Sequence, residues 1–313
     1  MNDIMPSYEE MKLPFFVYGT LKPGEIAFHQ IKDLIETYKE AKLISYALYI
    51  RDGIPVIFEN PNWYPVKGYL IWPKLNQYEI AKTLMDKYEG DRLYELKQVD
   101  AMTEQGSIEC LTYIGKHQAG SHPLESGALW FSKDDPIFSK SFPSLFSNIK
   151  ELSNQEINSG PEIEHWVNYN NLTSNYLLLV TIVERLAYLY CGELFEDRIV
   201  KRITTLGKCQ EYLEAFEECR KNQGLFHVEV FDSRSAGGKL NSKKSGNSLE
   251  AWYQVRSNLQ HRGKGAWRDV LIVKNSLVSL ANVMSILLPK LLPGIEDSTT
   301  YKELVTKELI KLN

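Results

Sequence analysis

Apolar positions follow two different patterns along the chain. Up to about Lys116, short apolar runs are separated by Gly and Pro, for example LISYALYI, GIPVIFE and ECLTYIG. Runs of this length and composition predict β-strands. One segment differs, because its apolar residues between Leu75 and Tyr88 recur at steps of three and four. This spacing predicts an amphipathic helix that ends at Gly90.

After these strands the pattern becomes polar and then helical. Residues 117–127 are rich in Gly and Ser, which predicts a linker. Beyond the linker, NYLLLVTIVERLAYLY is apolar on more than one face, as expected of a central helix in a bundle. We therefore predict a strand-rich region up to about Lys116 and a helical region after the linker.

Composition narrows the possible functions without identifying one. The formal net charge is −4, so any basic surface for nucleic acid would have to be local. The four cysteines form no zinc-binding spacing, and no Gly-rich phosphate-binding motif occurs. The most apolar segment, Ser276–Gly294, is interrupted by Asn282 and Lys290, which favours a buried helix over a membrane span. We expect a cytoplasmic protein with reduced thiols, no metal, no cofactor and no membrane contact.

A first candidate site lies in the stretch FFVYGTLKPGE, where a predicted strand ends in a sharp turn. If the strand ends at Tyr18, the N–H groups of Gly19, Thr20 and Leu21 have no partner in a sheet. Gly19 allows the chain to bend tightly and a ligand to approach the main chain. Successive free N–H groups form a concave surface that suits an anion such as a carboxylate.

Glu89 is a second candidate part of the same site, because it lies at the end of the predicted amphipathic helix. The negative end of the helix dipole disfavours a carboxylate there. Tyr88 and Tyr94 provide a partly apolar setting that also raises a carboxyl pKa. A Glu adjusted in this way suits proton transfer near neutral pH, although most Glu residues near helix ends are only solvated surface groups.

These motifs resemble the gamma-glutamylcyclotransferase superfamily in its AIG2-like branch. Besides FFVYGTLKPGE, the blocks VKGYLIWP and LMDKYEGDRLYELKQVDA occur in the expected order. The resemblance implies a small mixed β-barrel with a cavity, within an α+β protein. It also implies a reaction in which the α-amine of a γ-glutamyl group attacks its own γ-carbonyl, giving 5-oxoproline and a free amine.

By position, the resemblance assigns roles to the residues of the first site. Glu89 would relay the proton, and Tyr94 would help to wall the pocket. The main chain of residues 18–21 would hold the substrate carboxylate, with Tyr18, Gly19, Thr20 and Leu21 contributing. Two positions after Tyr94, where the family often has Arg, this chain has Leu96.

A second candidate site lies in AWYQVRSNLQHRGKG, where Arg256 and His261 are five residues apart. Five residues correspond to roughly 140° of rotation on a helix, so the two do not lie side by side. A symmetric dimer would bring two such pairs into one cleft. Arg256 would bind a phosphate and His261 would transfer protons, so that an RNA 2′-OH attacks the adjacent phosphate without a metal. Asn258 would orient the substrate or the imidazole.

The helical region resembles the HEPN superfamily, particularly its Apea-like branch. VRSNLQHRGKG is followed by a long apolar helix, and HWVNYNNLTSN precedes it. This resemblance, over roughly residues 128–295, implies a homodimer with a ribonuclease site at the interface. Ser257 occupies the position after Arg256 where the superfamily usually has Asn, Asp or His.

The two resemblances imply domains over residues 13–116 and 128–295, followed by a tail over 296–313. Three functional hypotheses follow from them. In the first, a cyclotransferase-like pocket for a small carboxylate-bearing ligand is joined to a ribonuclease-like domain acting in stress response, as a toxin or in antiphage defence. In the second, the protein is a metabolic cyclotransferase whose helical domain only dimerises. In the third, it is a non-enzymatic regulator.

Overall fold

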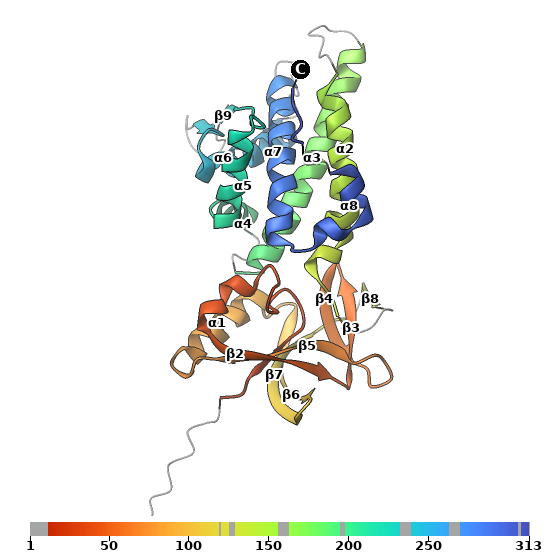
Figure 1. Ribbon diagram of the computed structural model, residues 1–313, viewed down its shortest axis with the longest axis vertical. Helices are drawn as coiled ribbons and strands as arrows, with labels where there is room; N and C mark the ends of the chain where they lie inside the picture. Colours follow the sequence, from red (N-terminus) through yellow and green to blue (C-terminus); the bar gives the residue numbers. More distant parts are fainter. Residues whose placement is uncertain are drawn as a thin grey trace, which may run out of the picture. The chain divides into compact units, whose positions relative to one another are not determined.

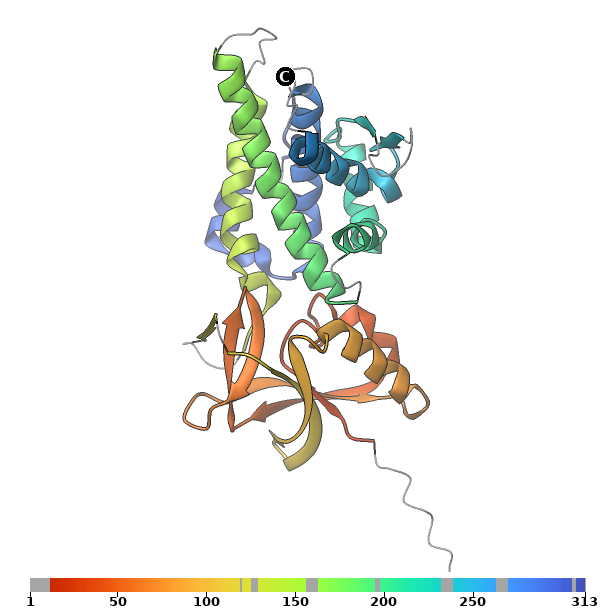
Figure 2. The ribbon, with the colours of Figure 1, turned by 180° about the vertical axis from the view of Figure 1, so that it is seen from behind.

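The computed structural model describes residues 12–118, 120–124, 129–155, 163–194, 198–231, 239–262, 270–305 and 308–312. The chain divides into two compact units (Figures 1 and 2). The first comprises the described residues up to Phe131 together with Gly192–Leu194, and the second comprises the remainder from Ser132 onward. The structure therefore has a mixed α+β N-terminal region and a helical C-terminal region.

A closed five-stranded barrel forms the centre of the first unit, with strand order β1-β5-β2-β6-β7. Its strands are β1 (Phe15–Val17), β2 (Ile35–Leu43), β5 (Val66–Pro73), β6 (Tyr94–Thr103) and β7 (Gly106–Gly115). All neighbouring pairs are antiparallel except the one between β1 and β7, where Phe15 pairs with Leu111. This parallel pair closes the barrel and leaves the loop after β1 at its edge.

A three-stranded sheet with order β4-β3-β8 accompanies the barrel. Its strands are β3 (Tyr46–Arg51), β4 (Ile54–Glu59) and β8 (Ser121–Pro123). Asp52 and Gly53 both have positive φ, at 52° and 74°, which allows a tight hairpin between β3 and β4. β8 lies inside the range for which the sequence predicts a linker, and pairs with β3.

The predicted amphipathic helix is present as η3 (Leu75–Gln77) followed by α1 (Tyr78–Glu89). Gly90 follows with φ 73°, a conformation that glycine adopts without strain. The buried face of α1 packs into one cluster with barrel residues including Phe15 and Ile71. Its members on the helix are Tyr78, Ala81, Met85 and Tyr88. This packing fixes the end of α1, and with it Glu89, against the barrel.

The second unit is built on the long helix α7 (Val270–Leu291), which packs against α2, α3, α5 and α6. The remaining regular elements are α2 (Phe142–Ser153), α3 (Ile163–Cys191), α4 (Ile199–Leu206), α5 (Gln210–Lys221), β9 (Glu229–Phe231), β10 (Lys239–Asn241), α6 (Ser245–Arg262) and α8 (Thr299–Leu304). Shorter turns of helix are η1 (Phe28–Gln30), η2 (Lys32–Leu34), η4 (Ser132–Asp134), η5 (Ile137–Ser141) and η7 (Ile295–Asp297). Figure 1 shows α7 between α3 on one side and α5 on the other.

By length and composition α7 could cross a membrane, but 78% of its apolar window is buried inside the protein. Asn282, at its centre, is fully buried and bridges two other segments. Its amide nitrogen donates to the carbonyls of Gly224 and Ile310 at 2.9 Å each, and its oxygen accepts from the Ile310 N–H at 2.9 Å. The polar interruption in the apolar run is thus a buried structural junction. The range for which the sequence predicts a tail contains both α8 and Ile310.

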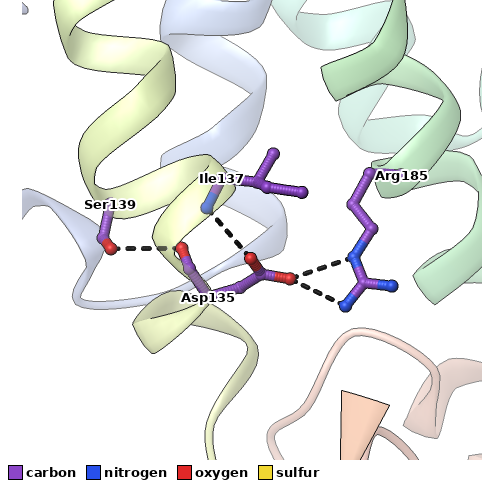
Figure 3. A network of polar contacts seen from close by, with 4 residues as sticks. All are labelled: Asp135, Ile137, Ser139 and Arg185. Atoms are coloured by element: carbon purple, nitrogen blue, oxygen red, sulfur yellow. Dashed lines mark hydrogen bonds and ion pairs between the residues drawn. The ribbon is translucent and has the colours of Figure 1, made fainter. Parts of the chain in front are cut away.

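One ion pair is buried within the second unit (Figure 3). Both Nε and Nη2 of Arg185, on α3, donate to one carboxylate oxygen of Asp135, at 3.0 and 2.9 Å. The other oxygen accepts from the N–H of Ile137 at 3.0 Å. The side chain of Asp135 is 1% exposed and that of Arg185 is 11% exposed. The pair fixes the segment before α2 against α3.

Candidate functional site

The loop after β1 presents a row of N–H groups that have no main-chain partner among the described residues. Its carbonyls are engaged: Gly19 accepts from the N–H of Lys22 at 3.2 Å, and Thr20 from that of Ala27 at 3.0 Å. Within the described part of the chain, the N–H groups of Gly19, Thr20 and Leu21 donate no hydrogen bond. The loop therefore has the donor pattern that suits a carboxylate.

Neighbouring elements hold this loop in place. The Tyr18 hydroxyl donates to the carbonyl of Tyr113, on β7, at 2.8 Å. The hydroxyls of Thr20 and Tyr88 are 2.8 Å apart, which ties the loop directly to the last turn of α1. A Cβ built on Gly19 would lie 3.0 Å from Cγ of Pro55, so β4 approaches the loop closely. The loop is thus fixed by β4, β7 and α1.

Glu89 follows Tyr88 directly and is half-buried at the end of α1. Burial raises the pKa of the Glu89 carboxyl to about 8. The pKa of Tyr18 is itself raised, first by burial and then by the nearby Tyr94 and Glu89. Tyr18 on the loop and Glu89 on α1 therefore belong to one electrostatic neighbourhood.

Aromatic hydroxyls line the surroundings of Glu89. Tyr94 donates to the carbonyl of Pro55 at 3.4 Å, and Tyr113 donates to Asp86 at 2.7 Å. The pKa of Tyr113 is raised by burial, by its bond to Asp86 and, to a smaller extent, by Glu89. Sequence reasoning identified Tyr94 but not Tyr113. Only the pairing of β6 with β7, which places Gly115 opposite Tyr94, brings Tyr113 to the site.

Gly192–Leu194, far along the chain, also belongs to the first unit and packs against Tyr88, the residue before Glu89. The N–H of Glu193 donates to the carbonyl of Tyr88 at 2.8 Å. Gly192 has φ 57°, and a Cβ there would lie 2.6 Å from the Tyr88 ring. Gly192 is therefore required by both backbone conformation and space. No local sequence signal indicates this contact.

The residues of the second candidate site lie on α6, in the helical unit. Arg256 forms an ion pair with Glu184 of α3 at 3.4 Å, and its guanidinium lies 5.4 Å from the Tyr253 ring centre. Asn258 accepts a hydrogen bond from Gln254, one turn earlier, at 2.9 Å. His261 belongs to the same helix, but its side chain lies outside the described residues.

The remaining features that bear on a site are a groove, the metal-ligating side chains and the cysteines. An open groove of about 560 Å³ runs along β2, β5 and β6, and its lining includes Lys42, Lys67, Tyr69 and Met102. It contains none of the candidate site residues. Across the described ranges, no group of three His, Cys, Asp or Glu side chains is arranged to hold a metal ion. The four cysteines are free and buried.

The first unit has the architecture of a small closed barrel, with an acidic helix end beside a turn rich in free N–H groups. Residues 15–131 match the family model described as gamma-glutamyl cyclotransferase, AIG2-like. This match confirms the AIG2-like domain that the sequence motifs predict, and it ends where the helical unit begins. Among curated proteins, no match to the chain was found.

Three solved structures illustrate what the chain is similar to. The uncharacterized protein PH0828 from Pyrococcus horikoshii is 18% identical, with 37% of this chain and 88% of that chain covered and a TM-score of 0.29. An AIG2-like protein from Mus musculus is 19% identical, with 33% and 77% covered and a TM-score of 0.29. YkqA from Bacillus subtilis is 21% identical, with 42% and 43% covered and a TM-score of 0.31.

The raised pKa of Glu89 predicts a pH-dependent cost to folding. The pKa is about 8 in the folded chain and near 4.5 otherwise, so the folded state binds the proton more tightly between these values. The free energy of unfolding contributed by Glu89 therefore falls as pH rises from 4.5 to 8. Compared with Glu89→Gln, the free energy of unfolding of the unmodified protein should fall by at most about 1.4 kcal/mol per pH unit over this range. Thermal unfolding of both proteins from pH 5 to pH 9 measures the difference, and parallel curves would contradict it.

Proposed function

We propose that the N-terminal domain is a cyclotransferase that cleaves γ-glutamyl amines and releases 5-oxoproline. One observation carries the proposal: a carboxyl group with a pKa of about 8 lies beside a loop whose three successive N–H groups have no hydrogen-bond acceptor among the described residues. The AIG2-like family match over residues 15–131 agrees with it. In this proposal the N–H groups of Gly19, Thr20 and Leu21 hold the substrate α-carboxylate.

Glu89 would act as the proton relay of this reaction. Its carboxylate accepts a proton as the substrate α-amine attacks the γ-carbonyl and forms the new C–N bond. The same proton then passes to the leaving nitrogen as the old C–N bond breaks. With a pKa of about 8, roughly one carboxyl in ten is ionised at pH 7, so kcat/KM should rise toward pH 8. Tyr94 would wall the pocket and help to exclude water.

Release of 5-oxoproline tests this proposal directly. Purified full-length protein is incubated with several γ-glutamyl amines at pH 8, and the cyclic product is measured by mass spectrometry. We expect product that depends on enzyme concentration. The proposal fails if no γ-glutamyl compound yields 5-oxoproline above the rate of spontaneous cyclisation.

We also propose that the helical domain, as a homodimer, cleaves RNA without a metal. The observation that favours it is the setting of Arg256, whose guanidinium is oriented by Glu184 and by the Tyr253 ring. On the same helix α6, Asn258 and His261 follow within two turns. Arg256 would grip the phosphate, Asn258 would orient the substrate, and His261 would move the proton. A cytoplasmic role in stress response, as a toxin or in defence would follow from such an activity.

Cleavage in the presence of a chelator tests the second proposal. We expect RNA fragments with 2′,3′-cyclic phosphate ends from the unmodified protein, and at least about a hundredfold less from Arg256→Ala and from His261→Ala. Arg220→Ala is the matched control, because Arg220 is an exposed arginine of the same unit and, among the described residues, its ion pair is with the neighbouring Glu217. Equal cleavage by all four proteins, or by none, would overturn the proposal.

A further inference from the structure

Arg51 is a cation beside the candidate pocket, and the proposed mechanism gives this residue no role. It ends β3, directly before the hairpin that leads into β4. Its guanidinium carbon lies 5.5 Å from the centre of the Tyr94 ring. One terminal nitrogen donates to the carbonyl of His117 at 3.1 Å. The aromatic ring and this carbonyl thus hold the charged group in one place.

Contacts connect Arg51 to the loop through the hairpin. Pro55, on β4, lies opposite Ile50 in the strand pairing. It accepts the hydrogen bond from Tyr94 at 3.4 Å and closely approaches Gly19. A continuous wall therefore begins at the N–H groups of the loop and ends at the guanidinium. It is formed by Gly19, Pro55, Tyr94 and Arg51.

The charge of Arg51 is available to a ligand. Within the described ranges, no carboxylate lies within ion-pair distance of its guanidinium. The hydrogen bond to His117 uses one of the five N–H donors that a guanidinium carries. The remaining donors suit a carboxylate, which an arginine binds with two parallel hydrogen bonds.

The pocket accordingly has two separate elements for recognising an anion. The first is the row of N–H groups at Gly19–Leu21, which is sufficient for the single carboxylate of a γ-glutamyl group. The second is Arg51, across Tyr94 from that row, and a γ-glutamyl group has no further anion to occupy it. The leaving amine is the only other part of the substrate.

We propose that Arg51 selects γ-glutamyl compounds whose leaving amine carries its own carboxylate. This inference rests on the proposed function of the barrel. Its chemical consequence is a preference for γ-glutamyl amino acids or peptides over γ-glutamyl amines with a neutral or cationic leaving group. Leu96, two residues after Tyr94 on β6, carries no charge, whereas Arg51 brings a cation to the Tyr94 ring from β3.

A matched pair of ligands tests the proposal. γ-Glutamyl-alanine and γ-glutamyl-alaninamide differ only at the end of the leaving amine, which carries a carboxylate in the first and a neutral carboxamide in the second. The Glu89→Gln variant should not consume these compounds, so their binding to this variant is measured by calorimetry. The measurement is repeated with Arg51 also changed to Gln. In parallel, the release of 5-oxoproline from both compounds is measured with the protein that keeps Glu89. Circular dichroism confirms that each variant is folded, and Arg220→Gln is the control for loss of an arginine.

With Arg51 present, we expect about ten- to a hundredfold tighter binding of the acid than of the amide. Arg51→Gln should remove this preference and leave binding of the amide unchanged, while Arg51→Lys should keep part of it. Equal affinity for the two compounds with Arg51 present, equal weakening of both by Arg51→Gln, or binding of neither would overturn the proposal. If the preference depends on Arg51 but no 5-oxoproline is released, the result would support the role of Arg51 in selecting the ligand and would reject the proposed reaction.

Discussion

Replacing Glu89 with Gln is expected to lower kcat for 5-oxoproline release by about 10²–10⁴-fold. Gln has nearly the same shape but cannot accept and return a proton. The binding loop at residues 19–21 uses main-chain N–H groups, which the substitution leaves unchanged. KM should therefore change little, and the loss should appear in kcat.

The matched control for this experiment is Glu79→Gln. Glu79 lies on the same helix, in its first turn. It is exposed and, within the described part of the chain, forms an ion pair with Lys12 at 3.5 Å. Activity within twofold of the unmodified protein is expected for this variant. If Glu89→Gln retained more than a tenth of the activity, Glu89 would not be the proton relay, even if the domain is a cyclotransferase.

The second large effect is expected for Asp135→Ala, which should destabilise the helical unit by about 3–5 kcal/mol. The change removes the only carboxylate in contact with Arg185 within the described ranges, and leaves that cation buried. It also removes the acceptor for the N–H of Ile137. For a unit of this size, the melting temperature should fall by roughly 6–20 °C.

A double substitution separates the buried charge from the loss of contacts. In Asp135→Ala with Arg185→Met no unpaired cation remains, so part of the lost stability should return. Asp134→Ala is the matched control: Asp134 is the preceding residue, is exposed, and should shift stability by no more than about 0.5 kcal/mol. Additive effects of the two single substitutions would show that the pair contributes no coupling.

The local elements of the first unit were predictable because their signals lie close together in the sequence. The spacing of apolar residues from Leu75 to Tyr88 predicts α1, and Gly90 ends it as expected. The turn after Tyr18 likewise leaves its N–H groups free, because the backbone geometry follows from the local composition of residues 19–24. Glu89 was identifiable for the same reason, since its position at a helix end is a property of the local sequence.

The surroundings of the candidate site were not predictable in the same way. Tyr113 reaches the site through the pairing of β6 with β7, and Arg51 through the hairpin between β3 and β4. Gly192 approaches Tyr88 from more than a hundred residues away in the chain. β8, a short strand in a polar segment, depends on the edge that β3 offers. Each of these features depends on contacts between distant segments, which leave no periodic signal.

The sequence by itself determined the order of a strand-rich and a helical region, the helix before Gly90, the turn after Tyr18 and the acidic residue at the helix end. These depend on backbone preferences and on the spacing of apolar side chains, which act over a few residues. Only the tertiary structure decided that Glu89 is desolvated enough to have a pKa of about 8, and that Arg51 stands against the Tyr94 ring. Desolvation and charge placement depend on everything that packs around a group, and that environment exists only once the chain has folded.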